Sequence, residues 1–194
     1  MNLFKKNSYN NIREIIEGCQ RNEGKAQCLF YDRYKSKLNG VCQRYAKTVA
    51  EAEDIFQEAF VKIFNNIHEL KNTEAADAWV KTIVIRTAIN YYNGTTKLQN
   101  LHDDIHKYDT EFSTEDYQQV IDKMDVEVLL EVINQLPNGY KMIVNMYLVD
   151  GYSHVEIAKM LDISEGTSRS QFLRGRNLLL KKLEQKGIIY NESF

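Results

Sequence analysis

The chain contains few residues that interrupt helices. Its 194 residues include one proline and nine glycines. These two residue types are the least compatible with a helix interior, so their scarcity predicts an all-α protein. The three cysteines, Cys19, Cys28 and Cys42, are odd in number and show no C-x-x-C spacing. Because an odd set does not make a disulfide framework, we expect free thiols in a reducing compartment.

Long apolar runs and a basic excess are also absent from the sequence. No apolar run reaches the ~20 residues that span a bilayer, and the N-terminal "MNLFKKNSYNNIREII" lacks the apolar stretch of a signal peptide. We therefore expect a cytoplasmic protein without direct membrane insertion. The net charge of −2 excludes a protein that wraps nucleic acid by bulk charge. Any DNA binding must be local or must depend on a partner.

Two helical blocks separated by a linker account for the pattern along the chain. The periodic apolar segments fall in residues 12–93 and 126–187, and residues 94–125 are polar. From Leu101 to Glu127 there are nine acidic residues against two lysines, a local charge of −7. Such a charge opposes collapse, so we expect two small helical domains joined by a flexible acidic linker.

The first block contains a helix with a wide apolar stripe, "AEDIFQEAFVKIFNNI". Two neighbouring rows at four-residue steps form the stripe: Ile55, Ala59, Ile63 and Ile67, and Phe56, Phe60 and Phe64. This spacing predicts a helix packed on one side, with polar residues on the other. A second helix, "AWVKTIVIRTAINYY", starts near Trp79, which we expect in the core. Asn72 or Thr73 is expected to cap its start.

The second block predicts a helix-turn-helix. Pro137 suits a helix start and Gly151 a left-handed helix end. Ser153 and Glu156 then form an S-x-x-E capping box that opens a short helix. "DIS" makes the turn, and Ser164 caps the last helix, which in this motif enters the major groove by its N-terminal end.

The last helix carries groups suited to DNA. We predict that Glu165, Arg169, Ser170 and Gln171 face base edges, because arginine grips guanine and glutamine grips adenine with two hydrogen bonds. Arg174, Arg176, Lys181 and Lys182 suit phosphates. From Glu165 to Lys186 six bases stand against two acids, an excess of +4. About four phosphate contacts bind weakly at cellular salt, so the motif needs a larger assembly to hold it on DNA.

Other interpretations remain open at this point. A charged helix face is often simply solvated, and a stand-alone helix-turn-helix regulator or an adaptor that never reads DNA would share these patterns. An enzyme is disfavoured because no nucleophile elbow, phosphate loop or H-E-x-x-H motif appears. His102 and His106 superficially resemble a metal cluster, but they lie in the acidic linker without a supporting shell. We therefore expect no metal, no cofactor and no small-molecule substrate.

Three segments resemble bacterial RNA polymerase sigma factors of the extracytoplasmic-function (ECF) type. In chain order they are "AEAEDIFQEAFVKIF", "AWVKTIVIRTAINYY" and "LP…VDGYSHVEIAKMLDISEGTSRSQFLRGRNLLLKKL". The resemblance implies a transcription initiation factor that is not an enzyme. The first block would be a sigma-two domain, whose Asp54, Gln57 and Glu58 bind the β′ clamp of core RNA polymerase. The second would be a sigma-four domain docked on the β flap, and an anti-sigma factor is a further possible partner.

The resemblance also implies DNA contacts in the first block. The loop from Leu70 to Asp77 would read and help to open the −10 promoter element, with Lys71, Asn72 and Thr73 lining a pocket for an extruded base. Arg86 and Asn90 would contribute from the following helix. The chain departs from the family here, since Arg86 stands where asparagine is common and Asn90 where aspartate is common.

The −35 promoter element would be read by the region from Ser164 to Arg176. Its expected contacts are Ser164, Glu165, Thr167, Arg169, Ser170, Gln171, Arg174 and Arg176. Ser168 occupies a usually apolar position of this helix. If it is buried, its hydroxyl needs a partner, and we expect the carbonyl four residues back to accept from it.

Overall fold

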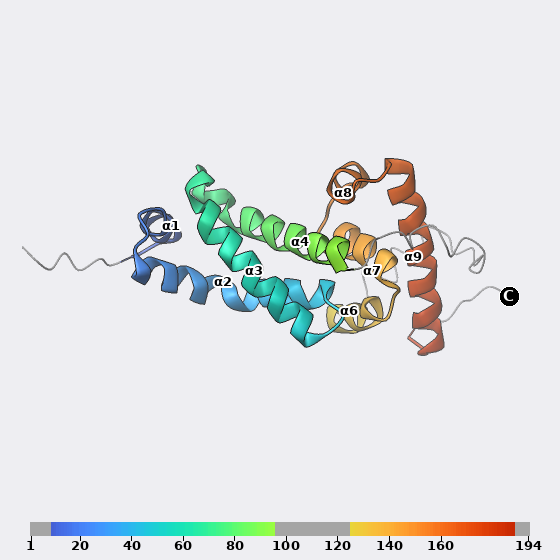
Figure 1. Ribbon diagram of the computed structural model, residues 1–194. Helices are drawn as coiled ribbons and strands as arrows, with labels where there is room; N and C mark the ends of the chain where they lie inside the picture. The colour runs from blue at the N-terminus through green and yellow to red at the C-terminus, as the bar shows by residue number, and fades with distance from the viewer. Residues whose placement is uncertain (1–8, 96–124, 189–194) are drawn as a thin grey trace, which may run out of the picture. The chain divides into compact units, whose positions relative to one another are not determined.

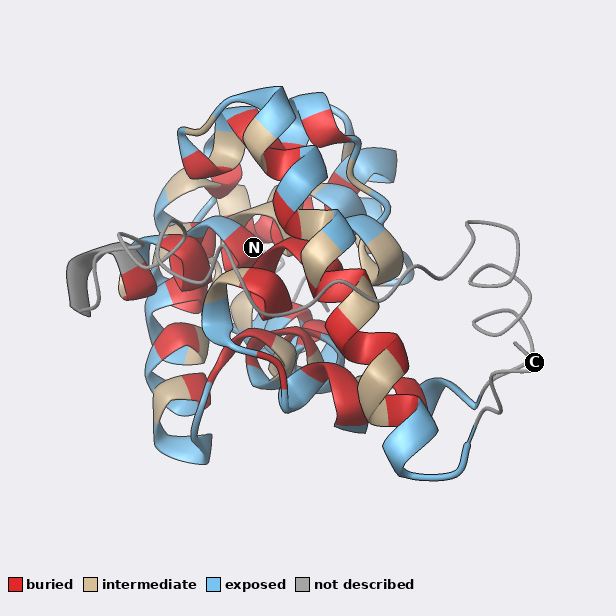
Figure 2. Cartoon of the chain, turned by 90° about the vertical axis from the view of Figure 1, so that its right-hand side faces the viewer, coloured by how far each residue is buried: buried red, intermediate tan, exposed pale blue. Residues whose placement is uncertain are grey.

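The computed structural model describes residues 9–95 and 125–188, and these residues form helices and no strand, which confirms the all-α prediction (Figure 1). The chain divides into two compact units with the boundary between Tyr91 and Tyr92. The expected acidic linker, with His102 and His106, lies outside the described residues apart from its two ends. Buried and exposed residues alternate around the helices, as amphipathic helices require (Figure 2).

The described residues of the first unit form four α-helices and two short 3₁₀ turns. Their bounds are α1 Ile12–Gln20, α2 Gly24–Tyr45, α3 Val49–Asn66, η1 Ile67–Glu69, η2 Thr73–Ala75 and α4 Ala76–Thr95, the last of which runs past the boundary. Side chains cap the helix starts: Asn11 Oδ1 accepts from the Glu14 amide at 3.0 Å, and Thr48 Oγ1 accepts from the Glu51 amide at 3.2 Å. These caps satisfy amides that have no partner within the helix.

The stripe side of α3 is buried, as predicted, and the helix that it packs against is α2. Ile55, Ala59 and Ile63 are fully buried. The aromatic row continues into α2, where Phe30 lies 5.8 Å from Phe64 between ring centroids. A tyrosine then ties α2 to α4: the Tyr34 hydroxyl donates to Asp77 Oδ1 at 2.7 Å.

Trp79 does not occupy the core position that the sequence predicts. On α4 the row of Val80 and Val84 is fully buried, whereas Trp79 and Ile83 on the neighbouring row are half-buried. The two rows are only one residue apart on the helix, so the pattern alone does not say which of them faces inward.

The second unit is built on a core of leucine, isoleucine and valine. Its helices are α6 Val126–Asn134, α7 Asn138–Val144, the π-helical turn η4 Asn145–Val149, α8 His154–Leu161 and α9 Glu165–Gln185. Pro137 stands at the start of α7, and Gly151 has a φ of 77°, both as predicted. α6, α7 and α9 share one cluster of buried side chains, which includes Ile133, Val144 and Leu179. This cluster fixes α9 through its middle and its C-terminal half.

None of the helices in the described part of the chain combines the length and apolar character that crossing a bilayer requires. Two of the three cysteines are buried and Cys28 is exposed. Burial raises the pKa of the Cys19 thiol to about 11 and that of Cys42 to about 12. The two buried thiols therefore act as small apolar core residues, as the sequence suggests.

Candidate nucleic-acid interface

α8 and α9 form the predicted helix-turn-helix. The capping box is present, because Glu156 Oε2 accepts from the Ser153 amide at 2.8 Å while Ser153 Oγ accepts from the Glu156 amide at 3.3 Å. Asp162 takes the left-handed conformation, with a φ of 55°, and turns the chain between the helices. Ser164 Oγ then accepts from the Thr167 amide at 2.9 Å and caps α9. The start of each helix is thus capped by a local side-chain hydrogen bond that the sequence predicts.

A small polar and aromatic cluster joins the two helices across the turn. Ser168 is fully buried, and its Oγ lies 3.0 Å from His154 Nδ1. The expected acceptor, the carbonyl four residues back, is therefore wrong, because the close approach of α8 brings a side-chain partner. Tyr147 stacks on the His154 ring at 4.5 Å and also contacts Phe172. Burial, and then the charge of Arg169, lower the pKa of His154, which favours the neutral ring.

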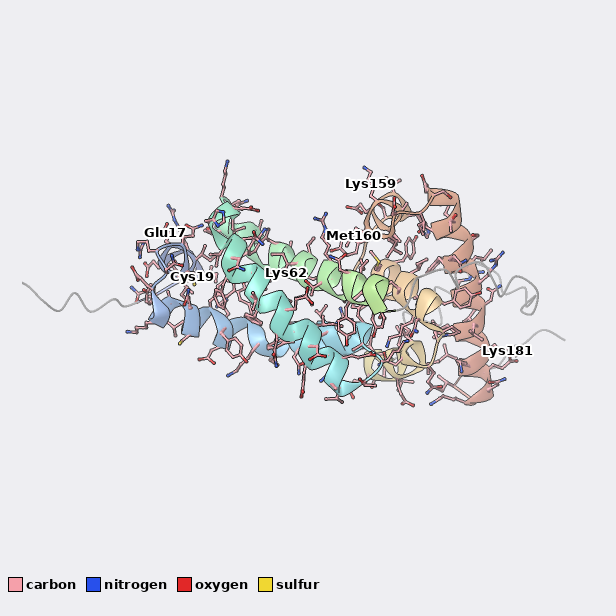
Figure 3. The ribbon with its side chains drawn as sticks, in the orientation of Figure 1. Glu17, Cys19, Lys62, Lys159, Met160 and Lys181 are labelled. Atoms are coloured by element: carbon pink, nitrogen blue, oxygen red, sulfur yellow. The ribbon has the colours of Figure 1, made fainter. Side chains whose placement is uncertain are left out.

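Charged and polar groups project from the first turns of α9. Glu165, Arg169 and Ser170 are exposed. Glu165 Oε1 accepts from Arg169 Nη2 at 2.6 Å and from Nε at 3.0 Å, one helical turn apart. Among the other expected contacts Ser164 is exposed, and Thr167 and Arg174 are half-buried. Lys181, further along α9, is half-buried too and is labelled in Figure 3.

Two of the expected DNA contacts do not reach the surface. Gln171 is 3% exposed and Arg176 is 7% exposed. Gln171 follows Ser168 by three residues and precedes Gly175 by four, so all three share the face of α9 that is turned inward. Arg176 lies beside that face, with its guanidinium 3.4 Å from Asn177 Oδ1. The expectation that both side chains are exposed is therefore wrong. For Gln171 the 3.6-residue period of the helix would have predicted burial, because it places Gln171 on the same face as Ser168 and Gly175.

The predicted loop of the first unit forms one side of a cavity of about 580 Å³. Lys71, Asn72 and Thr73 all line it, as expected. Asn72 Oδ1 accepts from the Glu74 amide at 3.0 Å; it caps the 3₁₀ turn η2 that leads into α4, rather than the start of α4 itself, and shapes the loop. The opposite side comes from α1, through Arg13, Glu17 and Gln20; Glu17 is labelled in Figure 3. Sequence reasoning missed these α1 residues, because they lie about 50 positions away and no local pattern marks them.

The remaining candidates lie on exposed helix faces. Arg86 and Asn90 are exposed on α4 and one turn apart, so they share a face, and neither lines the cavity. Asp54, Gln57 and Glu58 are exposed on α3, on the side away from its apolar stripe.

An ion pair steadies part of the α3 strip. Glu58 Oε1 lies 2.6 Å from Lys62 Nζ, one turn along the helix; Lys62 is labelled in Figure 3. Within residues 9–95 and 125–188, no group of three histidine, cysteine or acidic side chains could hold a metal.

Family models match both units. Residues 30–97 match sigma-70 region 2, and residues 127–179 match sigma-70 region 4. The matches cover the polar strip of α3, the cavity loop and the helix-turn-helix. Fold and site together thus define the class as a sigma-70-type transcription initiation factor, a class of proteins that are not enzymes.

Similar proteins of known identity indicate which type of sigma-70 factor this chain resembles. The chain is 30% identical over 182 residues to the ECF RNA polymerase sigma factor SigW of Bacillus subtilis (strain 168), covering 89% of this chain and 96% of the relative. It is 25% identical over 179 residues to the ECF RNA polymerase sigma-E factor of Haemophilus influenzae, covering 88% and 94%. Among solved structures, CnrH in complex with the cytosolic domain of CnrY has a TM-score of 0.50 at 14% identity, covering 90% of this chain and 97% of that one, and shares the fold.

The protein belongs to the ECF sigma factors. It is a promoter-specificity factor that binds core RNA polymerase and directs transcription initiation. The alternative of a regulator that acts without core polymerase is not favoured, because both sigma regions are present.

Proposed function

We propose that α9 reads the −35 element through Arg169, with Glu165 and Ser170 beside it. The observation that carries this assignment is the geometry of the helix-turn-helix, in which a capped helix start leaves Arg169 exposed on its second turn. An arginine there can bind a guanine edge with two hydrogen bonds, and the Glu165 carboxylate holds the guanidinium in place or accepts from a cytosine amine. Ser164, Thr167 and Arg174 then contact phosphates, whereas Gln171 and Arg176 support α9 from within.

The cavity of the first unit is the proposed site for an extruded base of the −10 element. Its volume, about 580 Å³, exceeds that of one nucleobase, and its lining is polar on both sides. Lys71 supplies positive charge for the strand, and Asn72 and Thr73 supply donors and acceptors for a base edge. Arg86 and Asn90 are proposed to contact the same DNA strand from the exposed face of α4. Taking a base out of the stack costs a few kcal/mol, so a pocket of this kind is what promoter opening requires.

The strip of Asp54, Gln57 and Glu58 is the proposed docking site for the β′ clamp. All three are exposed on one side of a helix whose other side is buried, so the strip is presented rigidly.

The two DNA-reading domains are proposed to be residues 12–93 and 126–187, joined by the linker 94–125, with the second domain also docked on the β flap. We place the protein in the cytoplasm, where core polymerase acts. The chain itself is proposed to have no catalytic activity, cofactor or small-molecule substrate.

Core polymerase supplies the affinity that the isolated chain lacks. With a net charge of −2 and about four phosphate contacts from α9, binding of the free protein to duplex DNA is weak at cellular salt. Holding both reading domains on one large partner turns the second contact into an intramolecular one and raises its effective concentration.

In vitro transcription with core polymerase over a promoter library tests the proposal. Core polymerase with this chain is expected to start at promoters that share −35 and −10 sequences. Arg169→Ala should lower selectivity at one −35 base pair by about 5- to 150-fold, the value of a bidentate contact. Arg33→Ala, an exposed arginine of α2, serves as the matched control and should leave selectivity unchanged. The proposed function would be contradicted if core polymerase did not bind the chain, or if initiation with the chain showed no promoter selectivity.

Two partner assignments need separate tests. The double variant Glu58→Lys with Lys62→Glu reverses the charge at Glu58 and keeps the ion pair with its two charges exchanged. It should weaken capture by core polymerase without changing the unfolding of the chain. An anti-sigma factor remains a prediction of the family resemblance. Its signature would be a protein that copurifies with this chain and blocks its binding to core polymerase.

A further inference from the structure

Gln20, the last residue of α1, holds the loop on the other side of the cavity. Its side-chain amide donates to the Ile67 carbonyl at 3.0 Å and to the Leu70 carbonyl at 3.1 Å. Gln20 is half-buried, and it also lines the cavity. One amide group thus uses both of its hydrogens on two backbone oxygens at the two ends of a single turn.

The two carbonyls belong to the segment that leads directly into the reading loop. Ile67 begins the 3₁₀ turn that ends α3, and its carbonyl also accepts from the Leu70 amide at 3.2 Å. Leu70 is followed at once by Lys71, Asn72 and Thr73. The Ile67 carbonyl thus accepts both from its own turn and from Gln20, and the added bonds from α1 fix the path of the chain beyond the turn.

α1 is itself rigidly attached, so it can serve as a reference for the loop. A Cβ added at Gly18 would lie 2.6 Å from Ala26 Cβ, which shows that α1 and α2 pack at close distance there. The end of α1 is closed by Asn22 in the left-handed conformation, with a φ of 58°, and by a bond of 3.0 Å from the Glu23 amide to the Gly18 carbonyl. Gln20 lies between these two fixed points.

We propose that Gln20 is a positioning residue for the −10 element: it sets the geometry of the loop from Leu70 to Glu74 before DNA arrives. This inference rests on the proposed function of the cavity. Without Gln20 the loop keeps its local hydrogen bonds but loses its contact with α1, so base binding is weakened by a greater cost of ordering the loop. α1, which lies outside the residues that match the sigma-70 region 2 model, thereby acts in promoter opening through the loop.

Gln20→Met tests the proposal, since methionine keeps the length of the side chain and removes both donors. Gln20→Asn, one methylene shorter, is a milder second variant that keeps the amide but does not span both carbonyls. Gln43→Met, at an exposed glutamine of α2, is the control. Hydrogen exchange of the free full-length chain should rise about fivefold at Leu70, Glu74 and Ala75 in Gln20→Met, and by a smaller factor in Gln20→Asn, because the loop loses two hydrogen bonds in the first variant and one in the second. The amides of α9 and those of the control should stay unchanged.

The functional readout is opening of the −10 element by the holoenzyme, followed with a fluorescent adenine analogue at the extruded position. Gln20→Met should slow opening and reduce base preference at the −10 element by about five- to tenfold, while −35 preference stays as in the wild type. Unchanged loop exchange in a folded Gln20 variant overturns the proposal, as does equal loss at both elements. If the wild-type holoenzyme opens no −10 element, the proposed function fails instead, and the exchange result still decides whether Gln20 holds the loop.

Discussion

Replacing Gly175 by alanine probes the contact that positions the DNA-reading helix. A Cβ added at Gly175 of α9 would lie 2.8 Å from Val144 Cγ2 and 3.1 Å from Tyr140 Cβ, both in α7. Carbon atoms in favourable contact are about 3.5–4.0 Å apart. Alanine therefore forces α9 away from α7, and the displacement extends along the helix to Arg169.

The change in the free energy of unfolding caused by Gly175→Ala is the sum of two opposing effects. Overpacking a closed core costs about 1–3 kcal/mol. Alanine returns up to about 1 kcal/mol of helix propensity relative to glycine. The net expectation for Gly175→Ala is a free energy of unfolding lower by about 0–2 kcal/mol.

Gly166→Ala isolates the steric effect within the same helix. A Cβ at Gly166 would meet only Ser164 Oγ, at 3.7 Å, an ordinary contact. The variant should therefore be neutral or slightly stabilising. The difference between Gly166→Ala and Gly175→Ala, about 1–3 kcal/mol, measures the clash. For a domain of this size each 1 kcal/mol corresponds to about 4–8 °C in Tm.

Thermal unfolding of the full-length chain, followed by far-ultraviolet circular dichroism, gives the comparison. Trp79 is the only tryptophan and lies in the first unit, so its fluorescence monitors that unit as an internal control. Equal midpoints for Gly175→Ala and Gly166→Ala would refute the close packing of α7 and α9. A lower midpoint for Gly175→Ala, together with weaker −35 selectivity in transcription, would support it.

Three further predictions concern titratable groups. Burial lowers the pKa of His154 in the folded state. The stability that this group contributes is therefore fully present above its unfolded pKa of about 6.5 and is lost as the pH falls through the folded-state pKa. The fall in Tm between about pH 7.5 and pH 5 should be smaller in His154→Gln than in the wild type. Tyr34→Phe removes the hydroxyl that donates to Asp77 and should lower the free energy of unfolding by about 1 kcal/mol, measured in urea, whereas an effect near zero would contradict the role of this bond. A disulfide reagent should modify the exposed Cys28 quickly and the two buried thiols only on unfolding; a fast phase that persists in Cys28→Ser would show that the burial is wrong.

The sequence by itself determined the features that arise from neighbours along the chain. The S-x-x-E box at Ser153, the cap at Ser164 and the left-handed Gly151 were all predicted, because each depends on residues within about four positions. The apolar stripe of α3 was predicted for the same reason, since the helical period fixes which residues share a face. The family followed from motifs in a fixed order, which again are stretches of contiguous sequence.

Only the tertiary structure decided which groups meet across the fold. Ser168 binds His154 rather than its own helix, and Arg176 is buried rather than exposed to solvent, because α9 is packed at an angle that its own residues do not specify. Gln20 reaches carbonyls 47 and 50 residues away, and a contact of that separation leaves no periodic trace in the sequence. Local hydrogen bonds and helical periodicity are encoded residue by residue, whereas the approach of two helices depends on the packing of every side chain between them.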